Sequence, residues 1–320
     1  MSVDRSDPGP RVLAHQSGGR GTVRVPYPVG VRPARIVGRT MVTPRMLRLT
    51  LAGPEIRDVL TFACDDHLGV VFPLEDGTRN DPTYDPDRQM LDWPRPMAPM
   101  RKYTIRRHDP VAGEIDLDIV LHPGGLASDW AVEAEPGDEV ILAGPPGSLA
   151  FPHTYSQYVF AIDSTALPAL ARWLDEGDWI ESGGVSVQVL VDIDDPSDAD
   201  YPLREREGVT VRWLPRTGGS QLADTVAALD LSGHDSGDVF LFAAGEAGDI
   251  APLRRWSKQQ GIAALITGYW KRGATLLAYE AAEHDDHDHD DHDHDGNHDH
   301  DDGHGHDHGH DHGHDDDHDH

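Results

Sequence analysis

Hydrophobic and polar residues alternate in short runs through the first half of the chain. Alternation over four to eight residues is typical of strands that bury one face. Turn residues separate the runs, and helical spacing is almost absent before residue 150. We therefore predict a small antiparallel β barrel. Its strands are expected within residues 34–53 (two runs flanking a Thr-Pro turn), 67–74, 103–107, 114–121 and 138–144.

Two segments of this half lack the alternation. Residues 1–30 are rich in Gly, Pro, Arg and Ser, and we expect a disordered arm there. Residues 78–99 are so rich in proline and aspartate that we expect a loop. The barrel domain is therefore assigned to residues 31–152.

The pattern changes after residue 152. An apolar run at 158–163 leads directly into helical spacing at 164–177, and strand and helix alternate to residue 261. This alternation predicts a parallel sheet of the nucleotide-binding kind, an α/β domain assigned to residues 153–282. Such sheets bind ligands at the carboxyl ends of their strands, which fall here at Asp163, Asp192, Arg216 and Gly245.

Charge is distributed unevenly. The formal net charge is -30, and residues 284–320 hold 15 histidines and 16 aspartates without lysine or arginine, so the other 283 residues carry -30 + 16 = -14. Both parts argue against nucleic acid as a partner. The single cysteine, Cys64, rules out an internal disulfide, a four-thiolate zinc site and a cysteine-held iron–sulfur cluster, so any redox chemistry needs a bound cofactor.

The apolar segments are short. The N-terminus lacks the apolar stretch of a secretory signal, and no window approaches the roughly 18 apolar residues of a membrane span. We expect a soluble cytoplasmic protein without an integral membrane segment. The oligomeric state stays open, with a monomer as the simplest expectation.

Residues 100–107, MRKYTIRR, place much positive charge on a strand of an acidic protein. Strand geometry puts Arg101 and Tyr103 on one face and Thr104 on the other. An arginine fork suits a pyrophosphate, and a tyrosine ring can stack on a flat heterocycle. The alternative is an edge strand with charged residues facing water.

Three strand-to-helix turns are further candidates. In LHPGGLASDWA (121–131), glycines precede a helix start at which Ala127 and Ser128 are small enough to admit a phosphate, although this is also an ordinary connection. IDSTALPALARW (162–173) lacks GxGxxG, and its Ser164 or Thr165 could simply cap the helix. AAGEAGDIAPLRRW (243–256) repeats the geometry with glycines at 245 and 248.

The motifs occur in a characteristic order: RxYT, LHxxGxAxxWA, GDEVILAGPPGS, STALPAL, AAGEA and GYWKRG. In this order, over about residues 32–280, the chain resembles the siderophore-interacting protein family of flavin-dependent ferric reductases. The resemblance implies a ferredoxin-reductase-like architecture, with an FAD-binding barrel followed by an NAD(P)H-binding α/β domain. It implies that NAD(P)H reduces the flavin, which passes single electrons to Fe(III) in a siderophore and so releases iron(II).

The resemblance also implies residue roles. Arg101 would hold the FAD phosphates, Tyr103 would lie against the isoalloxazine, and Thr104 would hydrogen-bond near its reactive edge. The other expected contacts are the flavin-lining Asp118, Val120 and His122, the pyrophosphate positions Ala127 and Ser128, and the nicotinamide positions Thr165, Gly245, Glu246 and Ala247.

Two positions that are commonly basic in the family carry uncharged residues here. Gly69 and Pro146 stand where relatives commonly carry lysine and arginine, which leaves Lys271 and Arg272 of GYWKRG as candidates for binding an anionic ferric siderophore. These two could equally be solvated helix residues. A less anionic substrate, or a different binding place, would also fit.

The nicotinamide preference is open. Asp192, Asp194 and Asp195 follow the second strand of the sheet, where a carboxylate favours the ribose hydroxyl of NADH. Arg216 after the third strand could accept the 2′-phosphate of NADPH, which the family resemblance favours.

The tail has its own chemistry. Its like charges and lack of apolar residues predict disorder without a ligand. A solvating acidic tail is one interpretation, but aspartate alone would suffice for solubility. Imidazoles among carboxylates suit several weak, exchangeable sites for divalent iron, nickel or zinc. The expected ligands are His284, His287, His289, His292, His294, His298, His300, His304, His306, His308, His310, His312, His314, His318 and His320. The alternative function is a metal-buffering protein on a flavoprotein scaffold with little reductase activity.

Overall fold

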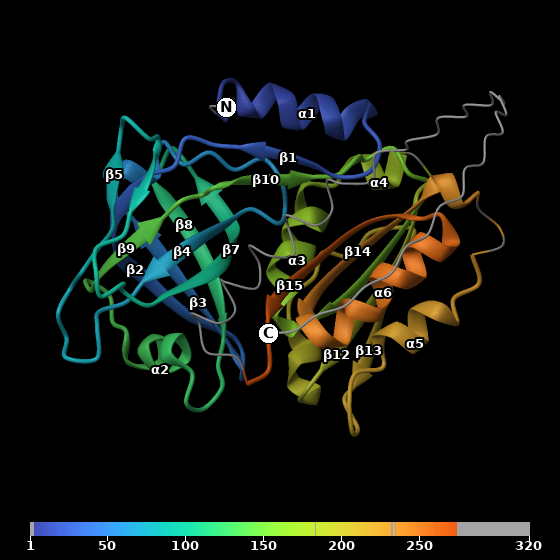
Figure 1. The fold of residues 1–320 in the computed structure, drawn as a ribbon. Helices are drawn as coiled ribbons and strands as arrows, with labels where there is room; N and C mark the ends of the chain where they lie inside the picture. Colours follow the sequence, from blue (N-terminus) through green and yellow to red (C-terminus); the bar gives the residue numbers. More distant parts are fainter. Residues whose placement is uncertain (1–2, 183, 232, 234, 274–320) are drawn as a thin grey trace, which may run out of the picture. The chain divides into compact units, whose positions relative to one another are not determined.

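The first half of the chain forms a closed antiparallel barrel (Figure 1). The computed structural model describes residues 3–182, 184–231, 233 and 235–273. Neighbouring strands around the barrel follow the order β2-β3-β8-β7-β4-β9. Their bounds are β2 (Val31–Thr43), β3 (Met46–Ala52), β4 (His67–Val71), β7 (Met100–Asp109), β8 (Glu114–Val120) and β9 (Glu139–Ala143). The predicted barrel is confirmed.

The alternation along each strand explains the barrel. Leu47, Leu49 and Leu51 of β3 are all buried in the barrel core, each removed from water at a gain of roughly 1.5–3 kcal/mol. Helix α2 (Leu126–Glu133) contributes Ala127 and Ala131 to the same core. The short helix η1 (Pro54–Ile56) follows β3. The barrel interior is therefore packed with side chains.

The second half is an α/β domain with a five-stranded parallel sheet, as predicted. The strand order is β13-β12-β11-β14-β15. Strand β11 lies at the centre, β12 lies beside it, and β13 forms one edge of the sheet. The strand bounds are β11 (Gln157–Asp163), β12 (Ser186–Ile193), β13 (Val209–Pro215), β14 (Val239–Glu246) and β15 (Ala263–Trp270). The helices are η2 (Ser164–Ala166), α3 (Leu167–Glu176), α4 (Trp179–Ser182), η3 (Pro196–Asp200), α5 (Leu222–Ala227), η4 (Ser236–Asp238) and α6 (Ala247–Gln260).

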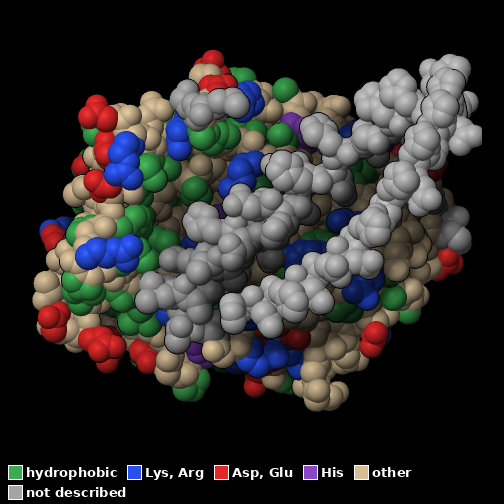
Figure 2. Space-filling model, in the orientation of Figure 1, with side chains coloured by type: hydrophobic (Ala, Val, Ile, Leu, Met, Phe, Trp, Pro, Cys, Tyr) green, Lys and Arg blue, Asp and Glu red, His purple; other side chains and the backbone are tan. Residues whose placement is uncertain are grey.

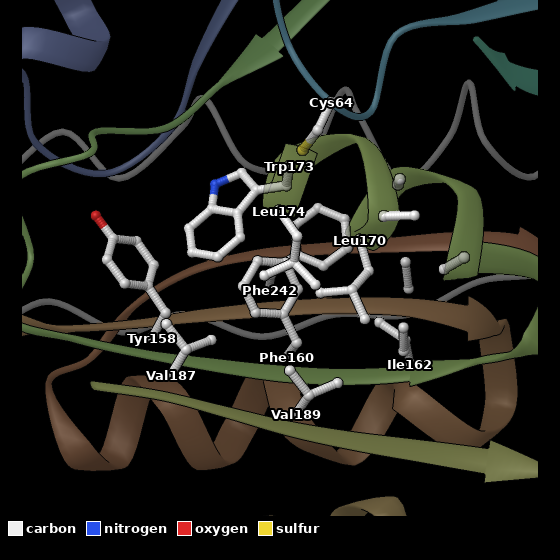
Figure 3. Close-up of a cluster of buried hydrophobic side chains, with 14 of the residues drawn as sticks. Cys64, Tyr158, Phe160, Ile162, Leu170, Trp173, Leu174, Val187, Val189 and Phe242 are labelled. Carbon is white, nitrogen blue, oxygen red and sulfur yellow. The ribbon is translucent and has the colours of Figure 1, made fainter. Parts of the chain in front are cut away.

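Two apolar layers cover the sheet. Helix α3 packs on one face with a core that includes Phe160, Trp173 and Phe242 (Figure 3). Helices α5 and α6 cover the other face through residues such as Val226 and Leu253. Cys64, from the barrel domain, joins the α3 core (Figure 3), and burial raises the pKa of its thiol.

The expectation of a disordered arm at residues 1–30 is wrong for much of the segment. Residues 8–18 form helix α1 (Pro8–Gly18), and β1 (Val23–Pro26) pairs with β10 (Gly147–Ala150). Contacts with the rest of the protein hold this Gly- and Pro-rich segment in place. The Gln16 side chain donates to the Phe62 carbonyl at 3.2 Å. The Tyr27 hydroxyl donates to Asp66 Oδ2 at 3.1 Å in the protein interior. Short helices depend on such packing more than on propensity.

Two smaller corrections concern local structure. The loop at residues 78–99 contains a short hairpin of β5 (Thr83–Asp85) and β6 (Met90–Asp92). Strand β15 ends at Trp270, so Lys271 and Arg272 directly follow a strand and do not lie in a helix. No helix in the part of the chain that the structure describes has the length and apolar character needed to cross a bilayer.

The barrel and the α/β domain are joined by buried polar contacts. Arg172 of α3 donates to Thr61 Oγ1 at 2.6 Å and to the Ile105 carbonyl of β7 at 3.2 Å. The Tyr201 hydroxyl, which follows η3, donates to Asp118 Oδ2 of β8 at 2.5 Å. These contacts fix the carboxyl ends of the parallel strands against β7 and β8.

Candidate functional site

Arg101 and Tyr103 lie on the inward face of β7. Their cross-strand partners on β4 are Val70 and Leu68, which belong to the barrel core, and Tyr103 packs against that core. Arg101 is half-buried and donates from Nη1 to the carbonyl of Met100 at 2.9 Å. Among the described residues it has no carboxylate partner. A half-buried guanidinium without a countercharge fits an anionic group.

Thr104 lies on the other face of β7 and is buried. Its hydroxyl lies beside Tyr269, which comes from β15 of the α/β domain, and acts to lower the pKa of that phenol. Arg101 and Thr104 therefore flank the same short segment of β7 from opposite sides. Thr104 belongs to the junction of the two domains.

Of the predicted flavin-lining positions, Asp118 and Val120 face the domain contact. The carboxylate of Asp118 accepts from Arg48 Nε at 2.6 Å and Nη2 at 2.7 Å, as well as from Tyr201. Val120 packs against the α3 core. Both oxygens of Asp118 are occupied by partners from this chain, and the structure does not bring its carboxylate to Arg101.

The turn between β8 and α2 has the form expected of an anion site. The His122 N–H donates to Ser128 Oγ at 2.8 Å, and a Cβ at Gly125 would collide with the His122 ring. Ala127 and Ser128 are buried at the start of the eight-residue helix. Among the described residues, no side chain caps this N-terminus. Its free N–H groups and the glycine-rich approach fit the pyrophosphate of FAD.

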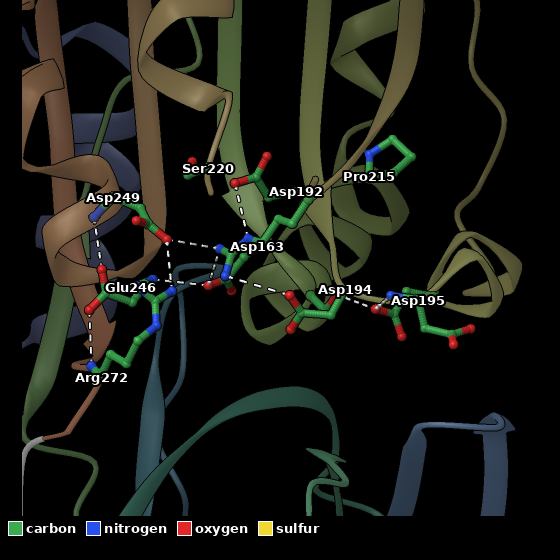
Figure 4. Close-up of polar contacts among 12 residues, drawn as sticks. Asp163, Asp192, Asp194, Asp195, Pro215, Ser220, Glu246, Asp249 and Arg272 are labelled. Atoms are coloured by element: carbon green, nitrogen blue, oxygen red, sulfur yellow. Dashed lines mark hydrogen bonds and ion pairs between the residues drawn. The ribbon is translucent and has the colours of Figure 1, made fainter. Parts of the chain in front are cut away.

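Asp163 organises the carboxyl end of the central strand β11 (Figure 4). Its Oδ1 accepts from the Thr165 N–H at 2.9 Å and from Thr165 Oγ1 at 2.5 Å. Its Oδ2 accepts from the Glu246 N–H at 2.9 Å and from Trp270 Nε1 at 2.8 Å. Burial raises the pKa of this carboxyl.

Gly245 is required where β14 turns into α6. Its φ is +149°, and a Cβ there would lie 2.6 Å from the Asp163 carboxylate carbon. Glu246 caps α6, with Oε2 accepting from the Asp249 N–H at 2.8 Å, and Ala247 begins the helix. The structure thus brings together Thr165, Gly245, Glu246 and Ala247, the four predicted nicotinamide positions.

Arg216 lies among four carboxylates at the same edge of the sheet. These belong to Asp163, Asp192, Asp194 and Asp249, which Figure 4 labels. Its side chain is 10% exposed. The distances are 3.1 Å from Nε to Asp192 Oδ2, 3.2 Å from Nη2 to Asp249, 3.6 Å from Nη2 to Asp163 and 3.8 Å from Nη1 to Asp194. Its positive charge is compensated within the chain.

The two predicted siderophore-binding residues differ in their surroundings. Lys271 is exposed. The Arg272 N–H donates to Glu246 Oε1 at 2.9 Å, and its guanidinium lies 3.4 Å from Asp249 Oδ2 and 5.6 Å from the Trp270 ring centroid. Arg272 therefore belongs to the nicotinamide turn. On the face drawn in Figure 2, acidic side chains are seen mainly toward the edges and several basic ones lie nearer the middle.

Gly69 has little room for a side chain. It lies opposite Lys102 on β7, and a Cβ there would collide with the Met100 sulfur. Pro146 lies in the turn between β9 and β10. A side chain at position 69 would therefore require Met100 to move.

Two residues that sequence reasoning missed are Asp65 and Tyr269. The Tyr269 hydroxyl donates to Asp65 Oδ1 through a short hydrogen bond between residues 204 positions apart. Burial is the main cause that raises the pKa of Asp65, to about 7. No local pattern signals this pair, because each residue gains its partner only when the domains pack together.

The predicted metal ligands, from His284 to His320, lie outside the described residues. Within the described ranges, no group of three or more His, Cys, Asp or Glu side chains is placed to hold a metal ion.

The barrel and the parallel-sheet domain together form the ferredoxin-reductase-like fold, which is also found in the ferredoxin reductase of carbazole 1,9a-dioxygenase (17% identity, TM-score 0.52) and in the Amycolatopsis cytochrome P450 reductase GcoB (15% identity, TM-score 0.52). Residues 35–149 match the model of the siderophore-interacting FAD-binding domain, and residues 155–273 match that of the siderophore-interacting protein. The chain belongs to the siderophore-interacting protein family.

Curated relatives and solved structures agree with this placement. The NADPH-dependent ferric-chelate reductase of Escherichia coli is 32% identical over 67% of this chain and 81% of its own length. The ferric vibriobactin reductase ViuB of Vibrio cholerae is 29% identical over 78% of this chain and 92% of its own. The crystal structure of a siderophore utilization protein from T. fusca superposes with a TM-score of 0.71 at 31% identity, covering 81% and 99% of the two chains.

Proposed function

We propose that this protein is an FAD-dependent NAD(P)H oxidoreductase that reduces the iron of a ferric siderophore in the cytoplasm. Two features of the barrel carry the proposal: the half-buried Arg101 has no carboxylate partner among the described residues, and no described side chain caps the N-terminus of α2. Each would offer positive charge to a phosphate of the dinucleotide. The names of the E. coli and V. cholerae relatives support the same reaction.

FAD bound at this site would accept a hydride from the nicotinamide and deliver electrons singly to Fe(III). Arg101, Ala127 and Ser128 would hold its pyrophosphate, and Tyr103 would orient its ring. Thr165, Gly245 and Glu246 would position the nicotinamide at the turn built on Asp163, where Gly245 packs directly against the Asp163 carboxylate. The buried domain contacts around Arg172 and Asp118 would keep water from the junction.

We favour NADPH as the donor because the E. coli relative is named for it, and Arg216 is the basic residue at the expected 2′-phosphate position. For the ferric substrate, position 69 carries no basic side chain, and Arg272 is engaged by Glu246 and Asp249, so Lys271 is the cation of the predicted pair without such an engagement among the described residues. This arrangement favours a ferric chelate of low negative charge.

The test is anaerobic bleaching of the purified protein's flavin absorbance by NADPH or NADH, followed by a ferric siderophore and an iron(II)-specific dye. We expect bleaching, then return of the flavin absorbance with two iron(II) per NADPH. A protein that binds no flavin, or a bleached flavin that no ferric chelate reoxidises, would overturn the proposal.

A second function is proposed for the tail. Its 15 histidines among 16 aspartates favour weak, exchangeable binding of iron(II), nickel or zinc. Removal of residues 284–320 should abolish most binding of Ni²⁺ and Zn²⁺ in calorimetric titrations while leaving flavin content and reductase turnover intact. Loss of flavin on truncation would show that the two functions are not separate.

A further inference from the structure

A chain of three neighbouring side chains crosses the domain junction beside β7. The Thr104 hydroxyl lies beside the phenol of Tyr269 and acts to lower its pKa, and the Tyr269 hydroxyl donates a hydrogen bond to Asp65 Oδ1. Thr104 and Asp65 belong to the barrel, and Tyr269 is inserted between them from β15. Thr104 is 8% exposed and Asp65 is 6% exposed, so both ends of the chain are buried, whereas Tyr269 between them is half-buried.

The proposed reaction leaves one proton over. One NADPH supplies two electrons and one hydrogen nucleus, and two ferric ions take only the electrons: NADPH + 2 Fe(III) → NADP⁺ + H⁺ + 2 Fe(II). Neither iron product carries the proton, so a group of the protein or the solvent must take it up. A route of hydroxyl and carboxyl groups is the usual means for such a transfer.

We propose that Asp65 is the acceptor of this proton, received through Thr104 Oγ1 and Tyr269 Oη. This step rests on the proposed function. Thr104 takes up a proton at Oγ1 and passes its own to Tyr269 Oη, and Tyr269 passes its hydroxyl proton to Asp65 Oδ1. One O–H bond breaks and one forms at each hydroxyl, and Asp65 ends the transfer as a neutral carboxyl.

The surroundings of Asp65 suit this role at neutral pH. Its pKa is raised to about 7, first by burial and then by the neighbouring Asp66, while the hydrogen bond from Tyr269 opposes the shift. The other ionisable groups near it are Cys64, whose thiol pKa is raised by burial, and His67, whose Nδ1 lies 3.4 Å from the Asp65 carbonyl oxygen. Arg172 acts electrostatically on Asp66 and Cys64.

Asp66 has a different task. Its carboxylate accepts from the Ser148 hydroxyl at 2.6 Å and from the Phe62 N–H at 2.7 Å, besides Tyr27. These partners tie β1 and β10 to the barrel and do not connect with Thr104. Of the two adjacent aspartates, only Asp65 continues the chain from β7.

The first readout does not depend on turnover. Infrared spectra of the FAD-loaded protein, recorded from pH 5 to 9, should contain a buried carboxyl C=O band that disappears with a midpoint near pH 7. Because other buried carboxyls also absorb, the band is isolated as wild type minus Asp65→Asn. Absence of a titrating band in that difference would overturn the proposal.

The second readout is the pH profile of the iron step. After anaerobic bleaching by NADPH, reoxidation by ferric citrate should accelerate in the wild type as pH rises through about 7, because only ionised Asp65 accepts a proton. Asp65→Asn and Tyr269→Phe should slow this step about 10-fold or more and flatten its profile, while bleaching by NADPH keeps its rate. Asp65→Glu should restore the pH dependence in part.

Tyr201→Phe is the matched control. Tyr201 also reaches from the α/β domain to a buried barrel carboxylate, yet its partner Asp118 is not bonded to Thr104. This variant should keep the wild-type pH profile. A wild type that never reduces ferric citrate or a ferric siderophore would overturn the proposed function and this route with it. A reactive protein whose Asp65→Asn and Tyr269→Phe variants keep the wild-type rate and profile would overturn the route alone.

Discussion

Arg101 and Arg216 are two arginines at opposite sides of the candidate site, and their surroundings differ sharply. Arg101, on the barrel, donates to one backbone carbonyl and has no carboxylate partner among the described residues. Arg216, on the α/β domain, lies within 3.8 Å of carboxylate oxygens from four aspartates. The first guanidinium is available to an anionic ligand, whereas the second already serves the fold.

The largest expected effect is on flavin binding. Arg101→Ala should weaken FAD binding about 30- to 1,000-fold, or about 2–4 kcal/mol, because the pyrophosphate loses its paired charge-assisted hydrogen bonds. Flavin content and fluorescence titration of the apoprotein measure the change. Arg107→Ala is the control, since Arg107 lies on the same strand but pairs with Asp116 at 2.7 Å. If the Arg101→Ala and Arg107→Ala variants bind FAD with equal affinity, Arg101 is not a specific ligand of the FAD phosphates.

Arg216→Ala should act on stability instead. It would leave Asp163 and Asp192 buried without their countercharge, at a cost of about 3 kcal/mol in the free energy of unfolding. Urea denaturation measures this cost, and the flavin content should stay at the wild-type level. An Arg216→Ala protein that loses flavin without losing stability would reverse the roles assigned to the two arginines.

Much of this contrast is invisible in the sequence. The motif at Arg101, Tyr103 and Thr104 is contiguous, so strand geometry alone separates its two faces. The four carboxylates around Arg216 come from β11, β12, the loop that follows β12, and α6. They become neighbours only through the strand order of the sheet. Sequence reasoning could place Arg216 at a strand end but could not show that its charge is compensated.

The fold was more predictable than the details of the site. Leu47, Leu49 and Leu51 alternate with more polar residues because only one face of the strand is buried. Such alternation is visible in the sequence, and it predicted the barrel. Helix α1 and strand β1 were missed because Gly- and Pro-rich sequence carries no periodicity, and partners such as Asp66 order it from a distance. The contact of Asp65 with Tyr269 was missed for the same reason.

A smaller effect, on nucleotide binding, should follow from removing one of the carboxylate charges beside Arg216. Asp192→Asn removes the nearest carboxylate charge, and we expect the KM for NADPH to fall about 3- to 10-fold because a 2′-phosphate then competes with fewer anions. The KM for NADH should change little. Asp195→Asn is the control, because Asp195 caps η3 and has no ion pair with Arg216 among the described residues. A parallel fall for both nucleotides would argue against 2′-phosphate recognition by Arg216.

The smallest effect is a difference in the pH dependence of stability between these two aspartates. Burial raises the pKa of Asp192 above its ordinary value of 3.8, so its contribution to stability is present below that pH and is lost as the pH rises. The hydrogen bonds from Ser197 lower the pKa of Asp195, so its contribution is present above pH 3.8 and is lost as the pH falls. Urea denaturation from pH 3 to 7 should therefore show a less steep decline with rising pH for Asp192→Asn, and a smaller loss at acid pH for Asp195→Asn. If the plots of stability against pH instead shift in the same direction for both variants, Asp192 is not a buried partner of Arg216, and the contrast between Arg216 and Arg101 fails.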